Sequence, residues 1–177
     1  MDLKRASIKD FDTIFTIIEK SFPLNEYRTY QKQKELFNNK RYQVYLSFNS
    51  NNEEVNGFVS VWNFDSFTFI EHLAILPNYR NQGIGSKILA ELNKKFFNQL
   101  CLEVELPNNQ IAKRRIEFYK RNGFHVNNYP YAQPPYLEGA NEIPMYLMTN
   151  QRAINIDEFK RFKATLYKEV YNIDLKQ

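Results

Sequence analysis

The sequence predicts an α/β fold of the α+β type, in which a mixed central sheet carries helices on both faces. Strand-like alternation recurs through the first half of the chain, and amphipathic helical spacing recurs between the strand-like segments. At the centre, a strand, a Gly-x-Gly loop, a helix and a second strand follow one another. A right-handed crossover would make these two strands parallel, whereas the strands before them form antiparallel hairpins.

The first half of the chain predicts two helices and four strands. The first helix has apolar residues at helical spacing and stops before Pro23, and the second is more polar. Two alternating segments around the turn-rich segment 49–56 are typical of a hairpin, and the next strand is continuously apolar and therefore central. The expected helices are 8–22 and 27–38, and the expected strands are 3–7, 42–48, 57–64 and 67–76.

The second half predicts three helices and three strands. An amphipathic helix begins at Ile84, another helix ends before Gly123 as its C-terminal cap, and a last helix has an aromatic face. The expected helices are 84–96, 110–122 and 157–171, the expected strands are 100–106, 124–129 and 143–148, and 130–141 is expected to be a loop.

Length and composition limit what kind of protein this is. A chain of 177 residues suits one domain, expected at 1–150, with 151–177 as a helical extension packed on it. The net charge of +4 is modest and its cations are scattered, so a nucleic-acid partner is not expected. One cysteine and two histidines exclude an internal disulfide and a structural zinc site, and no metal is expected.

The chain carries no sign of a membrane partner. Its start lacks the apolar stretch of a signal peptide, and no run of about 18 apolar residues occurs. The expected location is therefore the cytoplasm.

The segment Arg80–Ser86 predicts an anion site. It joins a polar loop to a helix, and helix N-termini present unpaired N–H groups that bind phosphate readily. Gly83 and Gly85 remove the side chains that would hold a diphosphate away from the backbone, and Arg80 adds a cation at the loop entrance. A plain strand-to-helix turn would need only one glycine.

Two other phosphate-binding motifs fit this segment poorly. A Walker loop needs Gly-x-x-x-x-Gly-Lys-Ser/Thr, which is absent. A dinucleotide fingerprint finds some support in Glu103, about 20 residues downstream, but Ile88 stands at the third glycine position. An NAD-dependent enzyme is therefore a minor alternative.

Three motifs in order resemble those of the GCN5-related N-acetyltransferase (GNAT) superfamily. They are Leu73-Ala74-Ile75 with the following Arg80-Asn81-Gln82-Gly83-Ile84-Gly85, then Leu102-Glu103-Val104, then Phe118-Tyr119-Lys120-Arg121-Asn122-Gly123-Phe124. The resemblance is strong over residues 57–124. It implies the GNAT fold, a mixed, mostly antiparallel central sheet with a splayed parallel strand pair and helices on both faces.

The resemblance also implies a cofactor site and a chemistry. Acetyl-coenzyme A would be the co-substrate, with its pantetheine arm paired to backbone groups of Leu73, Ala74 and Ile75. Its diphosphate would lie on the amides of the loop and first helical turn, comprising Arg80, Asn81, Gln82, Gly83, Ile84, Gly85 and Ser86. Tyr119 matches the tyrosine that protonates the departing thiolate in this family. The implied reaction is acetyl transfer to a primary amine by direct attack in a ternary complex.

One position departs from the family pattern. Many relatives have Asn seven residues before the tyrosine, where this chain has Ala112, and Asn108 or Asn109 is a candidate substitute. Three cations at 113–115 open the same helix. They suit either the 3′-phosphate of coenzyme A or a solvated surface.

Two glutamates are candidates for the base that deprotonates the amine. Glu103 matches the base position in relatives that acetylate ribosomal-protein N-termini, and Glu71 matches a catalytic histidine position in arylalkylamine acetyltransferases. A carboxylate in so apolar a strand needs a partner or a task, so a satisfied structural glutamate is the alternative. Alternation places Glu71 on the face of Leu73 and places His72 on the opposite face. Cys101 on a strand is expected to be inert.

The sequence says less about the amine that accepts the acetyl group. The segment Tyr129–Tyr136 is rich in Tyr and Pro, and it could be a lid over a cationic acceptor, a packed loop or a dimer contact. A small-molecule or peptide amine is the expected substrate, and a homodimer remains open. A non-catalytic acyl-coenzyme A sensor on the same fold is the main alternative function.

Overall fold

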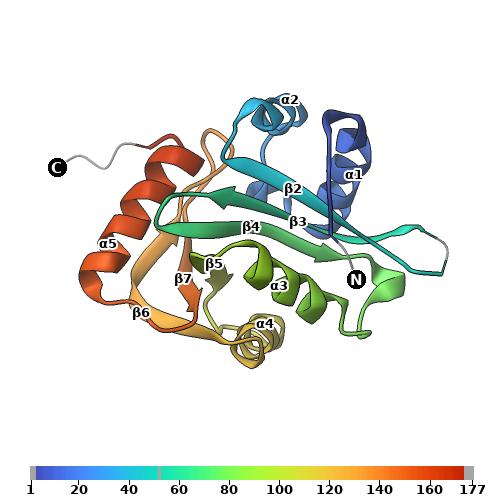
Figure 1. Ribbon diagram of the computed structural model, residues 1–177. Helices are drawn as coiled ribbons and strands as arrows, with labels where there is room; N and C mark the ends of the chain where they lie inside the picture. The colour runs from blue at the N-terminus through green and yellow to red at the C-terminus, as the bar shows by residue number, and fades with distance from the viewer. Residues whose placement is uncertain (1–2, 52, 174–177) are drawn as a thin grey trace. The chain divides into compact units, whose positions relative to one another are not determined.

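The computed structural model describes residues 3–51 and 53–173, and its chain forms two compact units, Met1–Asn98 and Gln99–Gln177 (Figure 1). Within each unit, neighbouring strands pair antiparallel and helices pack on them. The predicted division into a domain at 1–150 and an extension at 151–177 stays a prediction.

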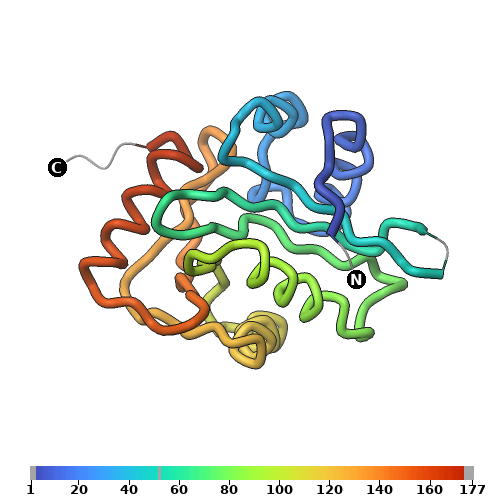
Figure 2. Tube along the Cα trace, viewed as in Figure 1, coloured from blue at the N-terminus to red at the C-terminus, as the bar shows by residue number. Residues whose placement is uncertain are grey.

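The sheet of the first unit has the strand order β1-β2-β3-β4, with every neighbouring pair antiparallel. Figure 2 shows β2, β3 and β4 as consecutive legs of one meander. The sequence predicted all four strands, two of them from period-two alternation, with ends that differ from the observed ones by no more than a few residues. The bounds are β1 Lys4–Arg5, β2 Tyr42–Phe48, β3 Val55–Asn63 and β4 Phe67–Ile75.

Helices cover both faces of this sheet, because alternate strand residues are apolar on each side. Helices α1 (Phe11–Ser21) and α2 (Tyr30–Glu35) lie on one face and α3 (Ile84–Lys95) on the other (Figure 1). Helix α2 is shorter than the predicted 27–38, because the side chain of Thr29 caps its start and residues 36–38 form a 3-10 turn.

Strand β4 contains a bulge that the sequence pattern did not indicate. Ser60 of β3 pairs with His72, but the next residue, Val61, pairs with Ile70, so Glu71 is inserted between two ladder positions. A bulge interrupts period-two alternation and re-aims the side chains beside it.

The sheet of the second unit has the order β5-β7-β6, again antiparallel. Its strands are β5 Gln99–Glu105, β6 Phe124–Gln133 and β7 Ile143–Asn150. Strand β6 extends four residues beyond the predicted end at Tyr129, so the first part of the predicted loop is strand. Its register is irregular, since β6 advances from Asn127 to Tyr131 while β7 moves only from Leu147 to Met145.

Helix α4 (Gln110–Arg121) packs on β5 and β6, and α5 (Ile156–Thr165) packs on β6. A capping box between Asn155 and Glu158 starts α5. The helix continues as one π-helical turn at Leu166–Val170, which buries Leu166, Tyr167 and Val170. No helix in the described residues is long and apolar enough to cross a membrane.

Candidate active site

The loop between β4 and α3 turns sharply because two of its residues have left-handed backbone conformations. Asn81 has φ 61° and Gly83 has φ 73°. Glycine adopts this region without steric cost, and asparagine is among the few other residues that tolerate it. Gly83 is the N-cap of α3, so the turn ends where the helix begins.

The first turn of α3 presents backbone N–H groups without a side-chain cap. Among the described residues none caps this N-terminus, and the first helical bond runs from the Lys87 N–H to the Gly83 carbonyl at 3.1 Å. The amides of 84–86 therefore lack intrahelical acceptors, and the helix dipole adds partial positive charge there. A Cβ atom at Gly83 would meet nothing within 4 Å, so the approach to the turn is open. This geometry suits a phosphate group.

Arg80 is held at the entrance of the same loop. Its Nε donates to the carbonyl of Ile75 at 3.1 Å, which fixes the base of the guanidinium against the end of β4. The guanidinium remains positively charged at any physiological pH. The loop that leads to the open amides therefore also carries one cationic side chain.

Close packing positions the segment Leu73–Ile75. Gly57 of β3 pairs with Ile75, and a Cβ atom at Gly57 would come within 2.8 Å of the Ala74 carbonyl oxygen. Only glycine allows β3 to approach β4 so closely here. Sequence reasoning did not single out Gly57, although it opens the strand preceding the Leu-Ala-Ile motif.

Glu71 is a buried ion-pair partner. Its side chain is fully buried and its Oε1 accepts a hydrogen bond from Arg28 Nη1 at 2.7 Å. Burial by itself raises the pKa of this carboxyl, but the charge of Arg28 and the contact with His72 outweigh it and lower the pKa to about 2. At neutral pH Glu71 is therefore an anion with very weak basicity.

The expectation that His72 lies on the opposite face from Glu71 is wrong. His72 Nδ1 lies 3.6 Å from Glu71 Oε2, because the bulge at Glu71 breaks the alternation. His72 Nε2 lies 2.9 Å from the carbonyl of Glu26, which only accepts, so Nε2 is the donor. His72 and Arg28 thus tie the segment after α1 to β4.

Glu103 occupies a network of hydroxyl and amide donors in the second unit. Its Oε1 accepts from the Tyr131 hydroxyl, and its Oε2 accepts from Gln133 Nε2 at 2.8 Å and from the Tyr171 hydroxyl at 2.7 Å. Tyr136 extends the network, since its hydroxyl oxygen lies 3.4 Å from that of Tyr171. The donors come from β6 and from the end of the π-helical turn, which places them around one carboxylate.

Tyr119 lies half-buried on α4, with its ring edge-on to Phe124 at 5.7 Å. Burial raises the pKa of its hydroxyl to about 12, and the nearby charge of Arg115 offsets this only partly. Tyr119 is therefore fully protonated at neutral pH. Its hydroxyl forms no hydrogen bond within the described part of the chain, so it is available to a ligand.

Asn109 and Cys101, which the sequence analysis considered, are engaged in the fold. The Asn109 side chain accepts from the Ala112 amide at 2.8 Å and caps α4, so its oxygen is already engaged. Cys101 is fully buried, and burial raises the pKa of its thiol well above the usual value, which keeps it inert. Among the described residues, no group of three or more His, Cys, Asp or Glu side chains is placed to hold a metal ion.

Comparison with known proteins decides the family. A solved structure of a protein from Bacteroides thetaiotaomicron that is assigned to the GNAT acetyltransferases matches with a TM-score of 0.89 and 31% identity. The match covers 98% of this chain and 100% of that one. The chain belongs to the GNAT acetyltransferase family. The Acetyltransferase (GNAT) domain profile also matches residues 40–126.

Two further likenesses agree with the family. YjbC of Bacillus subtilis (strain 168), which carries an acetyltransferase name, is 38% identical over 63 residues, a match that spans 34% of this chain and 32% of YjbC. The structure of NAA60 from Arabidopsis thaliana with acetyl-CoA has a TM-score of 0.65 at 18% identity, covering 84% of this chain and 96% of that one. These solved GNAT structures confirm the predicted fold class.

The predicted site residues of this GNAT chain fall into two groups, one in each unit. In the first unit, Arg80, Gly83 and the start of α3 gather at the end of β4, while Glu71 is committed to Arg28. The second unit holds Tyr119 and Glu103. Sequence reasoning missed the partners of both glutamates, namely Arg28, His72, Tyr131, Gln133 and Tyr171. Only the demand of a buried carboxylate for donors could have signalled that such partners exist.

Proposed function

We propose that this GNAT protein is an N-acetyltransferase that transfers the acetyl group of acetyl-CoA to a primary amine in a ternary complex. The observation that carries the proposal is the glycine turn at Asn81–Gly83, which leads into the uncapped N-terminus of α3 beside Arg80. Two phosphates and their charge fit such a group of open amides and one cation.

The residues support a division of labour in this reaction. Acetyl-CoA supplies an activated thioester. The loop Arg80–Ser86 would hold its diphosphate, and the backbone of Leu73–Ile75 would orient its pantetheine arm. Tyr119, protonated and without a hydrogen-bond partner in the described residues, would give its proton to the thiolate as the C–S bond breaks.

Of the two candidate bases, Glu103 has the better support. An ammonium group with a pKa near 10 must lose a proton before it attacks. Glu71 is an unsuitable acceptor of that proton because Arg28 holds its pKa low. Glu103 is anchored by neutral donors, and the hydroxyls of Tyr131 and Tyr171 touch both of its oxygens, so they could pass the proton to it.

Turnover and binding together test this function. Release of free thiol from acetyl-CoA, measured with a panel of amines, is expected to require both the amine and the enzyme. Isothermal titration should show binding of acetyl-CoA and coenzyme A but not of NAD. Binding without thiol release for any amine would favour the non-catalytic acyl-CoA sensor, and binding of NAD alone would contradict the proposal.

A further inference from the structure

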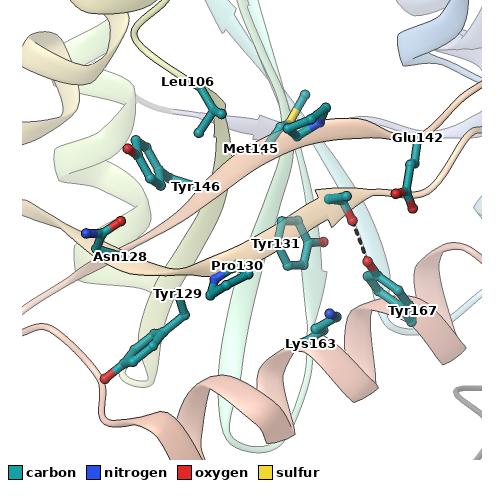
Figure 3. A pocket seen from close by; sticks show the side chains of 12 residues that line it. Leu106, Asn128, Tyr129, Pro130, Tyr131, Glu142, Met145, Tyr146, Lys163 and Tyr167 are labelled. Atoms are coloured by element: carbon teal, nitrogen blue, oxygen red, sulfur yellow. Dashed lines mark hydrogen bonds between the residues drawn. The ribbon is translucent and has the colours of Figure 1, made fainter.

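A cavity of about 570 Å³ opens in the second unit beside the irregular part of β6, the start of β7 and α5 (Figure 3). This volume lies within the range of small-molecule binding sites. The cavity shares a wall residue with the Glu103 network, because Tyr131 lines it and donates its hydroxyl hydrogen to Glu103.

Two backbone irregularities border the cavity. Pro130 has no N–H for the β-ladder, and it lies in the stretch where β6 gains residues relative to β7. On the other side, the helix widens to a π-helical turn at Leu166–Val170, which carries Tyr167 into the cavity wall. Both features are irregularities that often accompany functional sites.

Tyrosines form much of the wall, and hydrogen bonds hold the hydroxyls of three of them, Tyr129, Tyr131 and Tyr167. Figure 3 shows Tyr129, Tyr131 and Tyr167 on the side of β6 that faces α5, and Tyr146 on the other side of β6. The hydroxyl of Tyr167 donates to the Ala132 carbonyl at 2.5 Å, and Tyr131 is held by Glu103. Ring surfaces held in place favour a flat aromatic or apolar ligand body.

The cavity also contains two opposite charges that do not neutralise each other. Lys163 is half-buried, and its Nζ lies 5.3 Å from the ring centre of Tyr167. Within residues 3–51 and 53–173, no carboxylate lies within ion-pair distance of this ammonium. Glu142, just before β7, lines the same cavity and is exposed.

These charges narrow the class of ligand. A ligand with several positive charges, such as a polyamine, would meet the half-buried ammonium of Lys163, and a purely anionic ligand would meet Glu142. Like charges in a partly dry site repel strongly. A ligand with one group of each sign satisfies both residues.

We propose that the cavity binds an amine that also carries an aromatic body and a carboxylate, as an aromatic amino acid or a short peptide containing one does. The carboxylate pairs with Lys163, and the aromatic body lies between the tyrosines. The binding of this ligand is independent of the proposed function. Its role as the acetyl acceptor rests on that function.

Titration calorimetry with four ligands that share a phenyl ring but differ in their charged groups tests the binding. L-phenylalanine and glycyl-L-phenylalanine carry both charges at different separations, phenethylamine carries only the amine, and 3-phenylpropionate carries only the carboxylate. L-phenylalanine or glycyl-L-phenylalanine is expected to bind at least about tenfold more tightly than phenethylamine and 3-phenylpropionate. A factor of about ten corresponds to one hydrogen bond to a charged group. Equal binding of phenethylamine would overturn the proposal.

A matched pair of α5 variants isolates the charge. Lys163→Met keeps the length of the side chain and removes its ammonium, so it should reduce the preference over phenethylamine to within about threefold. Lys160→Met removes an exposed lysine of the same helix that does not line the cavity, and it should change nothing. Full retention of the preference in Lys163→Met contradicts the assignment.

Thiol release with the same ligands and with spermidine separates this inference from the proposed function. If spermidine is acetylated while the phenylalanine compounds neither bind nor react, the function stands and the cavity assignment fails. If the phenylalanine compounds bind in a Lys163-dependent way but no amine releases thiol, the cavity assignment stands and the function fails.

Discussion

Tyr119 combines a raised pKa with a hydroxyl that the described chain leaves without a partner. A phenol with a pKa near 12 gives up its proton only to a strong base. The Tyr119 hydroxyl therefore stays protonated and neutral until a thiolate forms beside it. A tyrosine that served only the core would need no more than the ring contacts that Tyr119 makes with Phe118 and Phe124.

Replacement of Tyr119 by Phe tests the donor role. The variant keeps the ring contacts and loses only the hydroxyl, so kcat should fall by about 100-fold, the lower end of general acid contributions, with the Kd of acetyl-CoA unchanged. Steady-state thiol release and calorimetry measure the two quantities. Tyr45→Phe, which removes a hydroxyl bound to Gln43 on β2, serves as the control and should retain its activity. An unchanged kcat in Tyr119→Phe would remove it from the mechanism.

The partners of the two glutamates could not be predicted at the residue scale. Sequence alone identified Glu71 and Glu103 as carboxylates in apolar strands, which need donors. Arg28 reaches Glu71 from 43 positions earlier, and Tyr171 reaches Glu103 from 68 positions later. Such pairs depend on tertiary packing, which no local pattern encodes. They matter for function because they make one carboxylate an ion-pair anchor and leave the other among neutral donors.

At the scale of elements, the turn between β4 and α3 depends on left-handed backbone conformations, one of them at Gly83. Gly83 has φ 73° in open space, so an added side chain would cost only backbone strain. Gly139 has the same properties, with φ 79° and no neighbour within 4 Å of an added Cβ. The two glycines are therefore matched in conformation but differ in location, because Gly139 lies in the turn after residue 137.

Alanine at each position should separate stability from binding. Both Gly83→Ala and Gly139→Ala should lower the free energy of unfolding by about 1–2 kcal/mol, the cost of a left-handed residue with a Cβ. Only Gly83→Ala should also weaken acetyl-CoA binding, by about tenfold, if the turn aligns the amides that hold the diphosphate. Urea unfolding and calorimetry provide the two readouts. Equal acetyl-CoA affinity in both variants would show that the turn is only structural.

Element boundaries followed the sequence where periodicity was uninterrupted. Strand β2 coincides with its predicted range, and α3 begins at the predicted Ile84. The pattern was misleading where the backbone is irregular. The bulge at Glu71 places His72 on the same side as Glu71, contrary to the prediction. The predicted strand stopped before Pro130, whereas β6 continues past its irregular stretch to Gln133. Both irregularities lie at candidate sites, where local rules are expected to fail.

At the scale of the whole molecule, acid stability should depend on the buried pair of Arg28 and Glu71. Folding lowers the pKa of Glu71 from 4.5 to about 2, so the unfolded chain binds the proton more readily. The contribution of the pair is therefore complete above pH 4.5 and is lost as pH falls towards 2. A shift of this size corresponds to about 3 kcal/mol of free energy of unfolding.

Glu71→Gln should remove this dependence on pH. The variant leaves the guanidinium of Arg28 buried without its anion, so unfolding at pH 7 should become easier by about 3–5 kcal/mol. Its stability should then fall less steeply than that of the parent protein between pH 4.5 and 2, because no proton is taken up at position 71. Trp62 is the single tryptophan, and its ring lies 5.8 Å from the Arg28 guanidinium, so its fluorescence reports unfolding near the pair.

A surface pair provides the control for this experiment. Glu91 and Lys94 are separated by 2.8 Å, nearly the distance in the buried pair, but the Lys94 side chain is 73% exposed. Water screens such a pair, so Glu91→Gln should hardly change stability at pH 7. The fall of its stability between pH 4.5 and 2 should run nearly parallel to that of the parent protein. If Glu71→Gln behaves like Glu91→Gln, the pair does not stabilise the fold through its charge. In that case Glu71 would again be a candidate base, because Arg28 would not hold the pKa of its carboxyl low.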